Sequence, residues 1–95
     1  MSEFLVESYA PRESAVILAA RVEELALALE QVSEPGADIR LLGAVFVPDD
    51  EICFYLCQAA SADTVRAAVA HARLPFDRIA EAVSIRPSEA DSCSA

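Results

Sequence analysis

The chain is poor in the residues that build loop-rich or disordered proteins. It has 95 residues, of which two are glycine, five are proline and 55% are hydrophobic. This composition argues against disorder and against a small scaffold held together by disulfides. A chain of this length buries about 60 to 70% of its unfolded surface, so one core is feasible without covalent staples. We expect a single domain over residues 1–87.

Basic residues are scarce as well. Seven Lys and Arg residues are scattered among sixteen Asp and Glu residues, which gives a net charge of −9. Such a chain repels nucleic acid and anionic membranes. No charged and apolar leader opens it, and its longest apolar run falls far below the roughly 18 residues of a membrane span. Together with an odd count of three cysteines, this predicts a reduced, bacterial-type cytoplasm, with no nucleic-acid or membrane partner.

Hydrophobic periodicity predicts four strands and two helices. "EFLVESY" alternates two unlike faces, as a strand does, and Ser14 is positioned to cap a helix with an apolar stripe from Leu18 to Val32. "SEPG", residues 33–36, is expected to end that helix. "PDDE" separates two apolar runs, which predicts a hairpin, and Ser61 precedes a second helical pattern that Leu74-Pro75 should end. The predicted order is strand 3–9, helix from Ser14, strand 38–47, strand 52–59, helix after Ser61, and strand 78–86.

This order is that of the split βαβ, or ferredoxin-like, fold. The predicted class is α+β with βαββαβ topology, a four-stranded antiparallel sheet and both helices on one face. Residues 88–95, "SEADSCSA", are small, polar and acidic, so we expect a disordered tail.

One face of the predicted sheet has no helix to cover it. If Phe4, Val6, Ile52, Phe54 and Leu56 point to the helices, the other face carries Leu5, Glu7, Tyr9, Cys53, Tyr55 and Cys57. A face this apolar usually marks an association surface. We therefore expect a homodimer that pairs through the open sheet face and encloses a shared interior.

Three segments carry a resemblance: "FLVESYAPR", "FVPDDEICFYLCQAASADTVRAA" and "LPFDRIAEAVSI". Across residues 3–87 the chain resembles a family of small bacterial ferredoxin-fold proteins, mostly known as a domain of unknown function, whose named members are nickel-binding proteins. The resemblance implies a homodimer and, in some members, nickel held at the dimer surface largely by histidines. His71 is the only histidine of this chain, so it is the candidate metal ligand, with further ligands from a second subunit.

Cys53 and Cys57 have the spacing of neighbours on a helix, but they belong to a predicted strand. Two residues four apart on one strand face lie about 13 Å apart, so they cannot chelate one ion together. Their alternation with Tyr55 indicates a strand face instead. On that face Cys53, Cys57, Tyr9 and Tyr55 are candidate contacts for a small molecule.

Carboxylates on the same face suggest a second hypothesis. Glu7, with Glu81 from the last strand, would be desolvated beneath a dimer partner and could act as general acid and base. The alternative is that these carboxylates pair with Arg40, Arg78 or Arg86. "DDE", residues 49–51, could hold a hard cation, although adjacent acidic residues in a turn more often stay solvated.

The sequence thus leaves two functions open. The first is a small dimeric binding protein for a metal ion, nickel being possible, or for a small molecule. The second is a cofactor-independent enzyme of isomerase or cyclase type that acts on an apolar molecule in the dimer interior.

Overall fold

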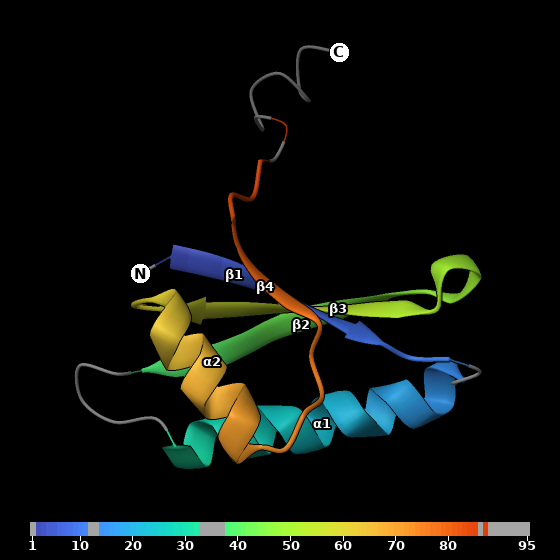
Figure 1. Cartoon of the computed structure of the whole chain (residues 1–95), viewed down its shortest axis with the longest axis horizontal. Coiled ribbons are helices and arrows are strands. Elements are labelled where there is room, and N and C mark those ends of the chain that lie inside the picture. Colours follow the sequence, from blue (N-terminus) through green and yellow to red (C-terminus); the bar gives the residue numbers. More distant parts are fainter. Residues whose placement is uncertain (1, 12–13, 33–37, 86, 88–95) are drawn as a thin grey trace.

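Four antiparallel strands form one sheet in the order β2-β3-β1-β4, and both helices lie on the same side of it (Figure 1). The computed structural model describes residues 2–11, 14–32, 38–85 and 87. The expected α+β ferredoxin-like topology is therefore confirmed. The elements are β1 (Ser2–Tyr9), α1 (Ala15–Val32), β2 (Ile39–Val47), a 3-10 turn η1 (Pro48–Asp50), β3 (Ile52–Ala59), α2 (Ala62–His71) and β4 (Arg78–Ala82).

Both helices begin where their capping serines predict. The Ser14 hydroxyl oxygen accepts from the backbone N–H of Ile17 at 3.2 Å, and the Ser61 hydroxyl oxygen accepts from that of Thr64 at 3.2 Å. Each cap satisfies a backbone donor that the helix itself leaves without a partner. Residues 33–36 and 88–95, for which we expect a helix stop and a tail, lie outside the described residues. The helix residues buried against the sheet are Leu18, Leu25 and Leu29 of α1, and Val65, Ala68 and Val69 of α2.

The last strand is shorter than the sequence pattern predicts. β4 pairs only with β1, and its final pair joins Ala82 to Glu3. Because β1 begins at Ser2, the chain has almost no strand left against which residues beyond Ala82 could pair. The strand therefore ends at Ala82 and not at residue 86.

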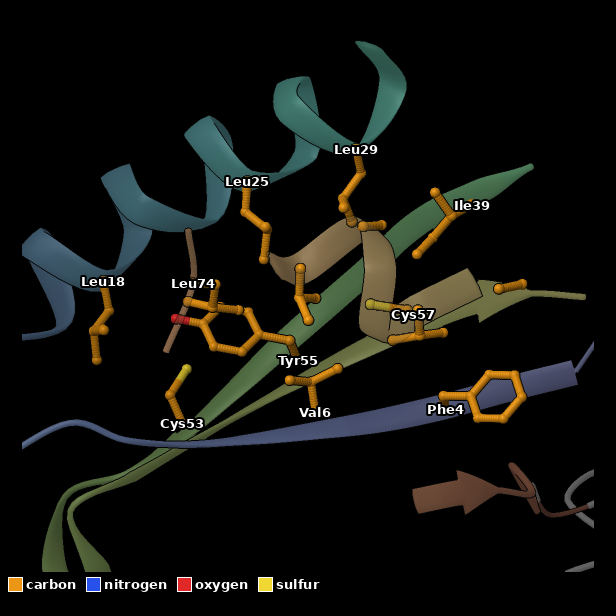
Figure 2. Packing of buried hydrophobic residues seen from close by; sticks show 14 of the residues in the cluster. Phe4, Val6, Leu18, Leu25, Leu29, Ile39, Cys53, Tyr55, Cys57 and Leu74 are labelled. Atoms are coloured by element: carbon orange, nitrogen blue, oxygen red, sulfur yellow. The ribbon is translucent and has the colours of Figure 1, made fainter. Parts of the chain in front are cut away.

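The predicted facing of β3 is wrong. β1 behaves as expected, with Phe4 and Val6 buried beneath the helices. Its register against β3, however, places Phe4 opposite Cys57, Val6 opposite Tyr55 and Ser8 opposite Cys53. Residues directly opposite one another share a face. All three β3 side chains therefore point to the helices, where each is at most 1% exposed (Figure 2).

The physical reason is that both faces of β3 are apolar, so the pattern alone does not say which one points inward. A shift of one residue exchanges the two sets. Ile52, Phe54 and Leu56 instead lie on the uncovered side, which we call the open face. By the strand registers the open face comprises Glu3, Leu5, Glu7, Tyr9, Arg40, Gly43, Val45, Val47, Ile52, Phe54, Leu56, Gln58, Arg78, Ala80 and Ala82.

Burial of Cys57 makes the stability of the fold sensitive to alkaline pH. The ordinary pKa of the thiol is 9.0, and desolvation raises the pKa of Cys57 to about 11. The folded state keeps the proton, whereas the unfolded state loses it above pH 9. The stabilisation is therefore present below pH 9 and is lost as the pH rises from 9 to 11, by about 2 to 3 kcal/mol.

We expect Cys57→Ala to be less stable than the wild type at pH 7, by about 1 kcal/mol, because a buried sulfur is removed. Between pH 9 and 11 the wild type alone should lose about 2 to 3 kcal/mol, so the variant should become the more stable of the two at the alkaline end. Urea unfolding across this range measures both curves. Two parallel curves would contradict a protonated, buried thiol in the folded state.

Candidate functional site

A hollow lies on the helix side of the sheet, where three segments meet. The end of β1, the middle of α1 and the segment that follows α2 enclose a pocket of about 580 Å³. This volume is in the range that takes a small molecule. The lining residues are Ser8 and Tyr9 of β1, Arg21, Glu24, Leu25 and Ala28 of α1, and Ala72, Arg73, Leu74 and Pro75.

The segment after α2 forms one wall of the pocket, and three hydrogen bonds join it to β1. The Ser8 hydroxyl donates to the Pro75 carbonyl at 2.6 Å. The backbone N–H of Asp77 donates to the Glu7 carbonyl at 2.7 Å, and the backbone N–H of Tyr9 donates to Asp77 Oδ2 at 2.8 Å. Ser8 is buried, so its hydroxyl needs this partner. The wall is thereby held on β1 through both backbone and side-chain groups.

Arg73, which directly follows the C-cap of α2, has an unusual backbone conformation. Arg73 has φ 60°, the left-handed region that favours glycine. Its N–H donates to the Ala70 carbonyl at 3.1 Å, and the Leu74 N–H donates to the Val69 carbonyl at 3.0 Å. These two bonds form a Schellman motif, with buried Leu74 and Val69 as its apolar contact. An arginine here carries a conformational cost that glycine would avoid.

The charged side chains that line the pocket carry a net positive charge. Arg21 and Arg73 line the pocket together with one carboxylate, that of Glu24. The chain has a net charge of −9 and only seven basic residues, so two cations on one small pocket are a marked local excess. Arg73 makes no ion pair with any residue in the described part of the chain. An anion would meet a favourable potential there.

A buried hydroxyl lies behind the pocket. Tyr55 is 0% exposed, and its hydroxyl has no hydrogen-bond partner of normal geometry among the described residues. Burial, and next hydrogen bonding and charge at the adjacent Cys53 thiol, raise the pKa of Tyr55 to about 12, while the charge and hydrogen bonding of the nearby Arg21 guanidinium lower it. Figure 2 shows the ring reaching beneath α1, with its hydroxyl end toward the part of the core that holds Cys53 and Leu18. Arg21 therefore connects the pocket to this hydroxyl.

The Cys53 thiol is not an activated nucleophile. Burial raises its pKa above the ordinary value, and the effects of Tyr55 and Arg21, which lower it, are smaller. Thiolate is the reactive form. Cys53 therefore remains a protonated thiol in the core, as does Cys57, and both are free cysteines.

The two predicted acid and base residues do not share a face. Glu7 lies on the open face and pairs with Arg78, at 3.5 Å between Oε2 and Nη1, as one of the alternatives anticipated. Glu81 stands opposite Phe4 and hence on the other side of the sheet, so the placement of the pair on one face is wrong. The enzymatic role of either carboxylate stays a prediction.

The candidate metal residues are dispersed. His71 is exposed at the last position of α2, and Asp49, Asp50 and Glu51 form the turn between β2 and β3. Within residues 2–11, 14–32, 38–85 and 87, no three His, Cys, Asp or Glu side chains come close enough to hold a metal ion. Nickel binding through His71 stays a prediction.

Of the predicted ligand contacts, Tyr9 borders the pocket from the end of β1, although its register places its side chain on the open face. Tyr55 and Cys53 lie behind the pocket, whereas Cys57 is elsewhere in the core. The sequence did not single out Arg21, Glu24 or Arg73. Arg21 and Glu24 look like ordinary residues of a wetted helix side. Only the folded chain brings them to the segment after α2, which is about fifty residues away in sequence.

Comparison with known proteins supports the fold alone. A protein of Streptomyces coelicolor A3(2), SCO4226, has a crystal structure that matches with a TM-score of 0.71 and 19% sequence identity. The match covers 88% of this chain and 100% of that one. No family model matches the sequence, and no curated protein matches it either. Among the described helices none is long and apolar enough to cross a membrane.

The strained backbone of Arg73 gives a test of this part of the site. Arg73→Gly should raise the free energy of unfolding by up to about 1 kcal/mol, because glycine adopts positive φ without steric cost. Ala70→Gly, at an ordinary helical position of α2, is the control and should lower the same quantity by about 1 kcal/mol. Urea unfolding of both variants measures the contrast. Destabilisation of equal size by the two glycines would contradict a left-handed Arg73.

Proposed function

We propose that this protein binds a small organic anion, a carboxylate on an apolar body, in the pocket between α1 and the segment after α2. The observation that carries the proposal is a pair of arginines on one pocket, Arg21 and Arg73, with the buried Tyr55 hydroxyl close to Arg21 behind it. In a chain of net charge −9, this arrangement favours a ligand that the rest of the surface repels.

The lining suits the two parts of such a ligand. Leu25, Ala28, Ala72 and Leu74 offer apolar contact, and Arg21 and Arg73 offer the cations. A guanidinium matches a carboxylate in geometry and can donate two parallel hydrogen bonds. The apolar body would lie against the leucines, with its carboxylate directed to the arginines.

Tyr55 adds a reason to expect an acceptor at this place. Buried hydroxyls nearly always have a hydrogen-bond partner, and one without a partner destabilises the fold. A ligand oxygen that enters past Arg21 would accept the hydrogen bond of Tyr55. Because the hydroxyl pKa is about 12, the tyrosine remains a donor throughout the physiological range.

Titration calorimetry with benzoate tests the proposal, with benzamide as the uncharged control. We expect benzoate to bind and benzamide to bind at least tenfold more weakly.

Tyr55→Phe should weaken the binding of benzoate about tenfold or more, since a hydrogen bond to a charged group contributes about 1.5 to 3 kcal/mol. The same variant should unfold at an equal or higher urea concentration, because it deletes a buried hydroxyl that has no hydrogen bond of good geometry within the described residues.

Arg73→Gly should also weaken benzoate at least tenfold without loss of stability, and Arg73→Lys should weaken it less. Equal affinity for benzoate and benzamide would contradict an anion site. So would benzoate binding that neither Tyr55→Phe nor Arg73→Gly changes.

A second proposal concerns assembly: two copies pair through their open faces. The observation that favours it is the apolar centre of that face, formed by Leu5, Ile52, Phe54 and Leu56, with Val45 63% exposed at its side. Exposed apolar area of this kind usually marks an association surface. Its charges are balanced, since Glu3 and Glu7 are matched by Arg40 and Arg78. A second copy can therefore approach here in spite of the net charge of each chain.

Sedimentation equilibrium should give about twice the chain mass of 10.2 kDa. Phe54→Glu should yield the monomer, because it places a carboxylate in the middle of the interface. Ile17→Glu, which replaces an exposed apolar residue of α1, is the matched control and should stay dimeric. A wild-type monomer across the accessible concentrations would rule the assembly out.

A further inference from the structure

The segment that follows β4 carries the most exposed apolar side chains of the C-terminal part of the described chain. Val83 is 80% and Ile85 is 89% exposed. Both lie past the last strand pair, that of Ala82 with Glu3. We call residues 83–85 the arm. Two large apolar side chains on so short a segment find no cover on the described part of their own chain.

The arm leaves the body on the side of the open face. In Figure 1 both helices lie on one side of the sheet, and the chain after β4 departs on the opposite side. A hydrogen bond of 2.5 Å from the Ser84 hydroxyl to Glu3 Oε1 ties the arm to the first residues of β1. Glu3 belongs to the open face. The arm is therefore anchored at the rim of this face and projects from it.

We propose that the arm of each chain packs on the second copy, so that Val83 and Ile85 clasp the partner that the open face binds. This inference rests on the proposed homodimer and deepens it. The occupant is a second copy because its body would lie on the same side to which the arm projects. Two-fold symmetry then gives each arm an equivalent place on the other chain, and both apolar side chains are covered.

Sedimentation equilibrium over a dilution series tests the arm separately from the face. The double variant Val83→Asp with Ile85→Asp should raise the dimer dissociation constant at least tenfold. The control is Val16→Asp with Ile17→Asp, since these α1 residues are also exposed, at 81% and 53%, and the change of net charge is the same. The control dimer should dissociate within twofold of the wild type.

The outcomes separate the two proposals. If the arm variant and the control dissociate alike while Phe54→Glu gives a monomer, the arm inference is overturned and the face proposal stands. If the wild type is a monomer, both fail. If the arm variant alone weakens the dimer, the clasp is supported, and circular dichroism of that variant confirms that its subunit is folded.

Discussion

The register between the two central strands governs the rest of the structure. β1 and β3 pair antiparallel along their whole length, with Val6 opposite Tyr55 at the middle. This pairing decides which side chains of β3 face the helices, because one residue of slippage would exchange the two faces. It places Tyr55 under α1, within reach of Arg21, and it leaves Phe54 and Leu56 uncovered. Both the pocket and the open face are consequences of one register.

Much of the fold could be predicted from the sequence because its signals are local. The alternation of residues 3–9, the caps at Ser14 and Ser61 and the turn after Val47 each depend on a few neighbouring residues, and each is confirmed. The facing of β3 could not be predicted in this way. Cys53 and Phe54 are both apolar, so periodicity gives no preference, and the choice depends on pairing with a strand almost fifty residues earlier.

The candidate site was less accessible to prediction for the same reason. Tyr9, Tyr55 and Cys53 were identified as possible contacts, but on the assumption that they share the open face. In the structure Tyr55 and Cys53 are core residues, whose connection to a pocket runs through Arg21. No local sequence pattern predicts the position of Arg21 at the pocket or the left-handed backbone of Arg73. Both follow from how α1 and the segment after α2 meet at the end of β1.

The distribution of charge gives the two surfaces different physical characters. In a chain of net charge −9, the repulsion of another negative charge is weakest near clusters of arginines. Two such clusters occur among the described residues, one at the pocket and one on the open face. At the pocket, Arg21 and Arg73 outnumber Glu24, which favours an anion small enough to enter. On the open face, two arginines balance two glutamates around an apolar centre, which favours a surface of the same composition. A separate copy of the chain meets that condition, whereas a free anion gains little there, because two glutamates offset the two arginines and Arg78 lies 3.5 Å from Glu7.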